Sequence, residues 1–404
     1  MTPNDYVIEV LDSPLGIDRF EWNSLLARQE HANPFMRHEY LAAMHHSASA
    51  SPRTGWTPQF FTLWKPYAAA HRAGLPGREL VGACALYLKS HSYGEYVFDH
   101  AWANAYHQHG LAYYPKALVA PPFTPVPGAR LLASDAVTRQ ALVQAVISWC
   151  RDIGLSSLHI LFASDADLLA CEAAGMMVRH NVQFHWTAPA GGYRDFEDFL
   201  ASLSQDKRKK IRQERRKVAH AGVAFRSARG GDISEHDWDF FYRCYERTYY
   251  EHGNAPYLSR EFFRHMAQDM AQDCLLFVAE REGTPIASSL VALNDTAIAP
   301  LTGAVAYGRY WGALERVDCL HFEACYYQPL AWCIVNRFQR FEGGAQGEHK
   351  MARALLPVKT RSAHWLDHPA FADAVQKFLD REGNGMERYF GDLEQRNPFK
   401  APAG

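Results

Sequence analysis

The order of predicted elements repeats along this chain, and that repeat constrains the fold more than any single motif. Each half begins with a strand, continues with helices and further strands, and ends with a helix, a strand and a helix. Strands alternating with helices predict packed α/β layers. A length of 404 residues exceeds the size at which one core usually stops growing, so two domains are expected. We place them at 1–188 and 189–404, joined by the Ala/Pro/Gly stretch 188–192.

Composition and charge argue against several classes of protein. The chain is 48% hydrophobic with a net charge of -2, which disfavours a wholly basic nucleic-acid binder. Its cysteines form no C-x-x-C pair and no H-E-x-x-H occurs, so neither a disulfide framework nor a metal site is expected. The N-terminus lacks the pattern of a signal peptide, and no run of 18 apolar residues occurs. We expect a cytoplasmic protein with no DNA partner and, at most, peripheral membrane contact.

The segment Phe341–Trp365 concentrates glycine, carboxylate, imidazole and cationic side chains. Its first part contains E-G-G-A-Q-G-E-H-K, and glycine lets such a backbone turn tightly and approach a ligand. We expect one glycine-punctuated loop that binds an anion and moves a proton, and a solvated surface loop is the alternative. The candidate site residues of this segment are Glu342, Gln346, Glu348, His349, Lys350, Arg353 and His364.

A strongly basic run lies at Lys207–Lys217, where K-R-K-K-I-R-Q-E-R-R-K carries eight cations and one acid. Ile211 and Val218 leave a narrow apolar stripe, which predicts a basic amphipathic helix. Such a helix is either a solvated face or a platform for an anion, such as RNA backbone, phospholipid head groups or a pyrophosphate. The residues expected to bind an anion or tRNA are Lys207, Arg208, Lys209, Lys210 and Arg212.

Two further segments mix polar groups with aromatic rings. The first, at 89–106, has the composition of a small-molecule pocket. It has equally the composition of an aromatic core in which buried Tyr and Trp side chains find hydrogen-bond partners. The second, Y-G-R-Y-W-G at 307–312, offers an arginine suited to bidentate binding of a carboxylate or phosphate, with an exposed surface arginine as the alternative. The residues given substrate-binding roles here are Tyr93, Glu95, Asp99, Arg309 and Tyr310.

Four motifs together resemble one bacterial family. H-S-Y-G-E-Y-V-F-D at His91–Asp99, P-P-F-T-P-V at Pro121–Val126, Y-G-R-Y-W-G and E-G-G-A-Q-G-E-H-K are similar to the Fem-like predicted N-acyltransferases. The resemblance covers nearly the whole chain. That group is related to the peptidoglycan interpeptide-bridge aminoacyl transferases and to the GNAT superfamily. The resemblance therefore implies mixed α/β structure in two tandem GNAT-like domains.

The resemblance also implies a reaction, the transfer of an acyl or aminoacyl group to an amine. The donor would be aminoacyl-tRNA or acyl-CoA, with no tightly bound cofactor. The acceptor would be an amine on a peptidoglycan or other cell-envelope precursor, or on a small molecule. GNAT enzymes bind pyrophosphate on an R/Q-x-x-G-x-G/A loop, and R-F-E-G-G-A at Arg340–Ala345 fits that pattern loosely. No P-loop, Rossmann or nucleophile-elbow motif occurs, so ATP hydrolysis, nicotinamide redox and serine-hydrolase chemistry lack support.

Acyl transfer to an amine requires that the amine lose a proton and that the tetrahedral oxyanion be stabilised. We expect Glu348 or His349 to act as the base, and Lys350 or Arg353 to face the oxyanion or a substrate phosphate. Direct attack by the amine needs no enzyme nucleophile. Two other functions stay open: an acyl-CoA-dependent acetyltransferase acting on a small molecule, and a non-catalytic protein that recognises a cell-wall or nucleic-acid ligand.

Overall fold

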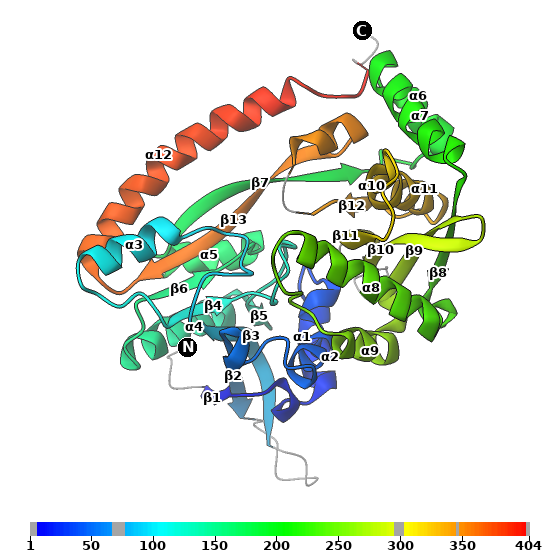
Figure 1. The fold of residues 1–404 in the computed structure, drawn as a ribbon. Coiled ribbons are helices and arrows are strands. Elements are labelled where there is room, and N and C mark those ends of the chain that lie inside the picture. The colour runs from blue at the N-terminus through cyan, green and yellow to red at the C-terminus, as the bar shows by residue number, and fades with distance from the viewer. Residues whose placement is uncertain (1–5, 67–76, 295–302, 345–346, 401–404) are drawn as a thin grey trace. The chain divides into compact units, whose positions relative to one another are not determined.

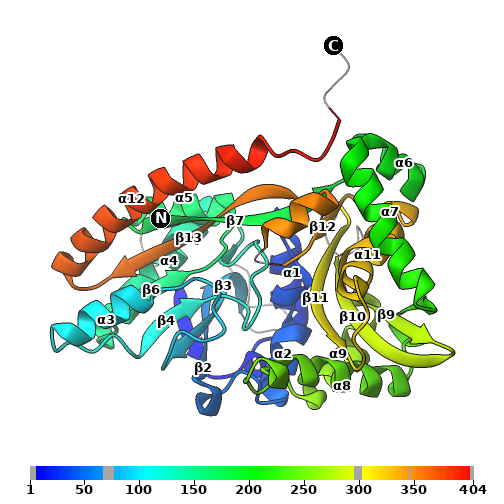
Figure 2. The same ribbon diagram turned by 45° about the horizontal axis from the view of Figure 1, so that its top comes forward.

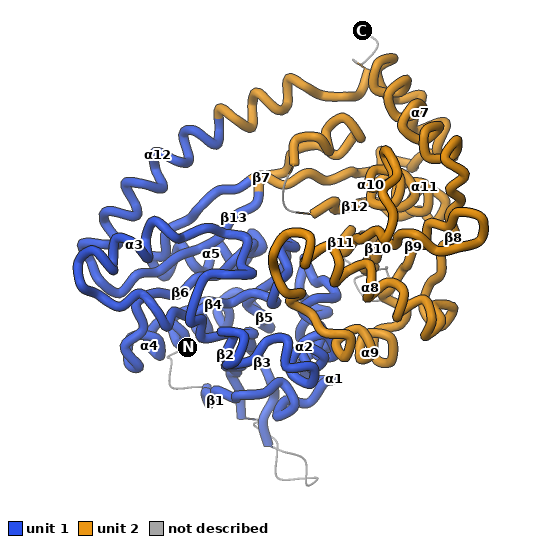
Figure 3. The backbone as a smooth tube through the Cα atoms, viewed as in Figure 1, with its two compact units in different colours: residues 1–181, 360–387 blue, residues 182–359, 388–404 orange. Residues whose placement is uncertain are grey.

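The computed structural model describes residues 6–66, 77–294, 303–344 and 347–400. Figure 1 shows its elements along the chain. The chain divides into two compact units, drawn in different colours in Figure 3. Unit 1 comprises residues 1–181 and 360–387, and unit 2 comprises residues 182–359 and 388–404.

Three elements contribute residues to both units. They are β7 (Met177–Thr187), β13 (Leu356–Leu366) and α12 (Pro369–Glu394). The division therefore differs from the linear boundary expected after residue 188, chiefly because residues 360–387 belong to unit 1. The cause is backbone pairing, since Ala363–Leu366 of β13 lies antiparallel to β6 of that unit.

Unit 1 is built on a mixed sheet. All neighbouring strands are antiparallel except β4 and β6, which run parallel. In sheet order the strands are β1 (Val7–Leu11), β2 (Trp56–Pro66), β3 (Arg78–Lys89), β4 (Lys116–Val119), β6 (Ser157–Ile160) and β13, with β5 (Leu132–Ala133) paired to β3. The helices are α1 (Arg19–Ala27), α2 (His38–His46), α3 (His100–Gln108), α4 (Ala136–Asp152) and α5 (Asp165–Ala173).

Two neighbouring residues of β2 show which helices cover the sheet of unit 1. Phe60 packs on Trp22 of α1, with ring centroids 5.9 Å apart. Phe61 packs on Trp149 of α4, at 6.0 Å. Successive side chains of a strand point to opposite faces, so α1 and α4 cover opposite faces of this sheet.

Unit 2 is built on a second mixed sheet. Here β11 and β12 are the parallel pair, and the other neighbours are antiparallel. In sheet order the strands are β8 (Val223–Arg229), β9 (Cys274–Arg281), β10 (Thr284–Asn294), β11 (Val305–Ala313), β12 (Arg340–Glu342) and β7. The helices are α6 (Phe196–Ser202), α7 (Gln205–His220), α8 (Glu235–Glu251), α9 (Arg260–Asp269), α10 (Leu320–Phe322), α11 (Gln328–Val335), the π-helix η7 (Glu323–Tyr327) and the 3-10 helix η8 (Glu348–Arg353).

The sheet of unit 2 also has helices on both faces, as Figures 1 and 2 show. Tyr310 of β11 packs on Tyr245 of α8, with ring centroids 5.3 Å apart, whereas the next residue, Trp311, packs on His321 of α10 at 5.4 Å. Gly312 lets α8 approach β11, because a Cβ there would lie 1.8 Å from the Cys244 carbonyl oxygen.

The two units repeat one plan. In each unit, a first strand is followed by two helices and then by antiparallel strands. A helical connection then joins the two strands of the parallel pair, which are β4 and β6 in unit 1 and β11 and β12 in unit 2. A further antiparallel strand then completes the sheet, and this strand is β13 in unit 1 and β7 in unit 2. The mixed α/β class and the duplicated element order expected from the sequence are confirmed.

One segment differs from the expectation stated above. The segment Phe341–Trp365 is not one loop, since it contains most of β12, all of η8 and most of β13. The basic helix is preceded by the separate helix α6, because Leu203 is extended and Ser204 is the N-cap of α7.

Candidate functional site

The parallel pair of unit 2 is short, and the glycine-rich segment begins where it ends. β11 and β12 pair through only three residues, ending at Tyr307 and Glu342. Gly343 and Gly344 follow directly. A Cβ on Gly343 would lie 2.5 Å from Leu355 Cδ2, so glycine is required for the chain to pass there. Gln346 lies outside the described residues.

Lys350 lies on η8, just after this segment, and its side chain is buried. Only 3% of the residue is exposed, and Nζ donates a hydrogen bond to the Gly344 carbonyl oxygen at 2.8 Å. Within the described residues, no carboxylate comes within ion-pair distance of this Nζ. Burial therefore lowers the pKa of Lys350 to about 8. An ammonium group has three N–H groups, so two remain available to a substrate.

His349 is the exposed neighbour of Lys350. Its Nε2 lies 3.2 Å from the hydroxyl of Tyr326, a residue of the π-helix η7. Partial burial, followed by the charges of Arg353 and Lys350, lowers the pKa of His349 below its usual value. The imidazole is therefore mostly neutral at pH 7 and able to accept a proton.

Arg353, also on η8, is held in a buried ion pair. Its NH2 lies 2.9 Å from both carboxylate oxygens of Glu214, on α7, and its guanidinium carbon lies 3.4 Å from the Phe322 ring centre. Tyr327 donates a further hydrogen bond to Glu214. These contacts hold η8 against α7, while Nε of Arg353 has no hydrogen-bond partner among the described residues. The ligand-facing role expected for Arg353 stays a prediction.

The two glutamates of the segment lie in different surroundings. Glu348 is exposed and accepts hydrogen bonds from the Tyr389 hydroxyl at 2.9 Å and from Arg396 NH1 at 3.0 Å. Glu342 is buried on β12, 3.1 Å from Nε of Arg340 and 3.8 Å from Nε2 of His185. Glu348 is thus held by the C-terminal segment of unit 2, while Glu342 belongs to a buried cluster with β7.

Of the segment 340–345 that fits the pyrophosphate pattern, residues 340–344 are described. Residues 340–342 form a strand, and Arg340 pairs with the nearby Glu342. An anion site of that kind lies at the N-terminus of a helix. Among the described residues that follow, the first helical element is the short 3-10 helix η8, which begins at Glu348.

The π-helix η7 supplies side chains to this site, although none of its residues was a candidate from the sequence. It lies between α10 and α11, and Pro329 begins the α11 turn that follows. Proline has no N–H and crowds the preceding turn, so a wider turn relieves the clash. Tyr326 contacts His349, and Tyr327 contacts Glu214. The sequence signal that could have indicated this π-helix is Pro329, which lies inside an apolar helical run.

The basic helix forms as predicted, with Ile211 and Val218 buried. Within the described residues, the side chains of Lys207, Arg208, Lys209 and Lys210 make no hydrogen bond or ion pair. They occupy the N-terminal end of α7, where the helix dipole disfavours positive charge. Stability of the helix therefore does not account for them, and their expected role in binding an anion or tRNA stays a prediction.

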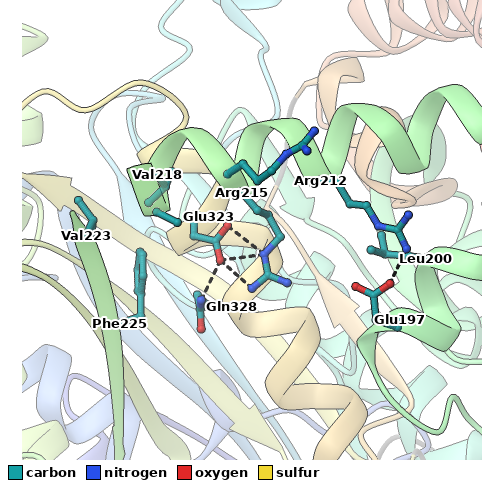
Figure 4. A pocket seen from close by; sticks show the side chains of 11 residues that line it. Glu197, Leu200, Arg212, Arg215, Val218, Val223, Phe225, Glu323 and Gln328 are labelled. Atoms are coloured by element: carbon teal, nitrogen blue, oxygen red, sulfur yellow. Dashed lines mark hydrogen bonds and ion pairs between the residues drawn. The ribbon is translucent and has the colours of Figure 1, made fainter. Parts of the chain in front are cut away.

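A pocket of about 480 Å³ lies beside α7, and Figure 4 shows it from close by. Glu323 of η7 is buried at its wall and accepts hydrogen bonds from Arg215 and from Gln328. Arg212 pairs with Glu197 at 2.5 Å. Three arginines of α7 thus line this pocket. Glu323 of η7 neutralises Arg215, and Glu197 of α6 neutralises Arg212.

The candidate residues of the first half gather around a buried lysine of unit 1. Lys116 is fully buried, and its Nζ donates hydrogen bonds to Glu95 at 2.8 Å, to Ser92 at 2.8 Å and to Asp99. Burial alone would lower the pKa of Lys116, but the charges of Glu95 and Asp99 outweigh it and raise the pKa. Burial raises the pKa of Glu95 to about 7. Tyr93, by contrast, is 66% exposed.

His364 extends the same buried network. Its Nδ1 lies 2.7 Å from Nδ1 of His159, whose Nε2 lies 3.1 Å from the Tyr113 hydroxyl. Tyr113 in turn donates to Asp99 at 2.7 Å. Burial lowers the pKa of His364 to about 3. His364 thus belongs to a buried polar network of unit 1, in which its own Nε2 has no hydrogen-bond partner among the described residues. The other described candidates of its segment belong to unit 2.

Arg309 and Tyr310 lie on β11 beside α8, where they line a pocket in unit 2. Among the described residues, no group of three His, Cys, Asp or Glu side chains is arranged to hold a metal ion. No helix in the described part of the chain is both long enough and apolar enough to cross a membrane.

Comparison with known proteins identifies a family and a fold. The model of the FemAB-like family, described as peptidoglycan biosynthesis/recognition, matches residues 14–401. Among curated proteins, none matches this sequence.

Solved structures share the fold at low identity. The crystal structure of FemX is 10% identical, with a TM-score of 0.51, covering 91% of this chain and 100% of its own. L-PGS from Bacillus licheniformis is 8% identical, with a TM-score of 0.52 and coverage of 92% and 99%. The C-terminal domain of a putative lysylphosphatidylglycerol synthetase from Agrobacterium fabrum is 9% identical, with a TM-score of 0.51 and coverage of 91% and 97%.

Proposed function

Because the chain belongs to the FemAB-like family, we propose that it transfers an acyl or aminoacyl group to an amine of a cell-envelope precursor. The family match and the tandem GNAT-like fold support the reaction class. The observation that carries the proposal within this chain is the pair His349–Lys350 on η8. His349 provides a neutral imidazole, and Lys350 provides a buried ammonium group that uses one of its N–H groups to bond the Gly344 carbonyl. Both residues follow the short parallel pair of β11 and β12 in the chain.

His349 and Lys350 have separate roles in the proposed reaction. The acceptor amine attacks the carbonyl carbon of the donor, and His349 takes the proton that the amine loses. Lys350 faces the negative charge that develops on the carbonyl oxygen, where a positive group in a low-dielectric site has its largest effect. The C–O or C–S bond to the carrier then breaks, and an amide remains on the acceptor. No covalent enzyme intermediate is needed.

The donor is expected to carry phosphates, because α7 offers cations that no acid neutralises among the described residues. Both aminoacyl-tRNA and acyl-CoA have this property. Lys207, Arg208, Lys209 and Lys210 project from one helix, which suits an extended phosphodiester backbone better than a single pyrophosphate. We therefore favour aminoacyl-tRNA as donor, acting in the cytoplasm where charged tRNA occurs.

The test is an acyl-transfer assay with both donor classes. Purified protein is incubated with charged tRNA or with acyl-CoA and a peptidoglycan precursor that carries a free amine, and amide product is followed by mass spectrometry. We expect product from the wild type and at least a hundredfold loss in Lys350→Met, with Glu348→Gln as the matched control that retains turnover. Tight precursor binding with no product from either donor would instead support the recognition protein.

A further inference from the structure

We propose that the pocket beside α7 binds an elongated amphipathic acid, in which a hydrocarbon chain carries a single carboxylate. Its volume of about 480 Å³ lies within the range of small-molecule sites. The residues that line it come from α6, α7, β8, η7 and the first turn of α11, all within unit 2. This proposal goes beyond acyl transfer and does not rest on it.

The positive wall of the pocket is formed by α7. Arg212 precedes Arg215 by three residues and Arg216 by four, and all three line the pocket. Side chains at these spacings are neighbours on a helix surface, and like charges there destabilise the helix. Helix stability therefore does not explain why three arginines gather beside one pocket. An anion bound among the guanidinium groups would offset their repulsion.

The charge of the ligand is inferred from the ion pairs of these arginines. Glu323 is only 4% exposed and holds Arg215 at 3.0 Å, so this pair belongs to the pocket wall. The pair of Glu197 with Arg212 is exposed and contributes little, so a ligand can compete for Arg212. Within the described residues, the side chain of Arg216 makes no hydrogen bond or ion pair. Three arginines and two glutamates leave one positive charge, which favours a monoanion and opposes an ammonium group.

The hydrocarbon chain of the ligand is inferred from the apolar wall. Figure 4 shows Val223 and Phe225 of β8 on one side of the Arg215–Glu323 pair and Arg212 on the other. Phe225 packs against two hydrophobic clusters of unit 2, so the apolar wall continues into the core. Hydrocarbon that covers such a wall leaves water, which stabilises the complex. Because the apolar wall and Arg212 lie apart, a ligand that reaches both must be elongated.

The test uses one hydrocarbon chain with different head groups. Binding of octanoate, 1-octanol and octylamine to the whole protein is measured by calorimetry at one low ionic strength. We expect octanoate to bind at least tenfold more tightly than octanol, and octylamine to bind most weakly. Butyrate keeps the carboxylate but has a shorter chain, so it should bind at least tenfold more weakly than octanoate. Octanol, octylamine or butyrate binding as tightly as octanoate, or no binding of octanoate, would overturn the proposal.

Variants then locate the site. Arg216→Gln removes the unmatched charge, so it should weaken octanoate binding at least fivefold and leave octanol binding unchanged. Ala219→Glu places a carboxylate in the same wall, four residues after Arg215, and should weaken octanoate binding at least tenfold. Both positions are exposed, so both variants should fold. The matched control Arg316→Gln removes an exposed arginine outside the pocket and should leave octanoate binding unchanged. Unchanged octanoate affinity in either pocket variant, or an equal loss in the control, would refute the assignment.

A further ligand tests the charge of the head group. Octyl phosphate has the same chain as octanol and is mostly a dianion at about pH 7.5. Because one positive charge is unmatched, octyl phosphate should bind no more tightly than octanoate. Tenfold tighter binding of octyl phosphate would overturn the assignment of a monoanion. None of these probes is an activated acyl donor, so their binding is independent of whether the acyl-transfer assay succeeds.

Discussion

Lys116 of unit 1 and Lys350 of unit 2 are both buried, yet their surroundings are opposite. Lys116 lies between two carboxylates and a serine hydroxyl, which keep it charged. Lys350 bonds one backbone carbonyl and has no carboxylate in ion-pair distance among the described residues. The pKa of Lys116 is raised, and that of Lys350 is lowered to about 8. The two buried lysines therefore differ in their counter-charges: Lys116 has two carboxylate partners, and Lys350 has none among the described residues.

The same contrast appears at corresponding places in the two sheets. Across the parallel pair and its antiparallel neighbour, unit 1 places His159 between Leu118 and His364. Unit 2 places Phe341 between Ala306 and Trp186. The duplicated fold thus has a polar centre in unit 1 and an apolar centre in unit 2. The candidate chemistry of unit 2 lies in the segment after its parallel strand.

The largest expected effect is on stability in unit 1. Lys116→Met leaves the carboxylate of Asp99 buried without its lysine and leaves Glu95 only the more distant Lys89, at 4.0 Å. We therefore expect a loss of about 3–5 kcal/mol in the free energy of unfolding. Urea denaturation measures it. The matched variant Lys350→Met loses one hydrogen bond to a carbonyl and should cost about 1 kcal/mol. Similar losses in the two variants would remove the distinction between the lysines.

The next effect is on catalysis in unit 2. Lys350→Met removes the positive charge that we propose faces the oxyanion, and we expect turnover to fall by about 10²–10³-fold. The acyl-transfer assay measures it at saturating donor. Full turnover in a folded Lys350→Met protein would exclude the assigned role.

The pH dependence of turnover follows from the same two residues. The base His349 must be neutral, so kcat/KM should rise as pH increases through its lowered pKa. Lys350 must be protonated, so kcat/KM should fall again as pH increases through about 8. Lys350→Arg keeps its charge at high pH and should remove the upper limb while retaining part of the activity. An unchanged upper limb in that variant would assign the limb to another group.

A smaller and salt-dependent effect is expected on α7. Replacing Lys209 and Lys210 by alanine should weaken tRNA binding and lower the slope of log affinity against log salt by about 1 for each phosphate that is no longer neutralised. Filter binding over a range of salt concentrations measures the slope. The exposed Lys377→Ala is the matched control and should leave it unchanged. Equal slopes in all variants would show that α7 does not bind phosphate.

The smallest effect is expected at Glu348. Its exposed ion pair with Arg396 contributes about 0–1 kcal/mol. Glu348→Gln should therefore change stability by less than that and turnover by less than about threefold, a small fraction of the loss expected when a general base is removed. A large loss of turnover at unchanged stability would return the role of base to Glu348.

The sequence was informative where the signal is local. The basic amphipathic helix is visible because Ile211 and Val218 recur at helical spacing among cations. The duplicated element order likewise follows from local hydrophobic patterns. His349 and Lys350 were identifiable because they adjoin glycines in one short segment.

Interactions between distant residues were not visible in the sequence. Lys116 was not singled out, because its partners Glu95 and Asp99 are 21 and 17 residues away. Nothing in the sequence pairs Glu348 with Arg396, which lies 48 residues away. Nor does it pair Arg353 with Glu214, 139 residues away, and the roles expected for Glu348 and Arg353 stay predictions. Pairs of this kind depend on the folded arrangement and have no periodic signature.

The most direct measurement is the pKa of the Lys350 ammonium group in the folded protein. NMR titration of protein labelled with ¹⁵N-lysine follows each side chain, and the spectrum of Lys350→Arg assigns the resonance. We expect Lys350 to titrate near pH 8, while Lys116 stays protonated beyond the usual lysine range. A Lys350 pKa at the usual value of about 10.4 would contradict the central claim, because the lysine would then be an ordinary ammonium group.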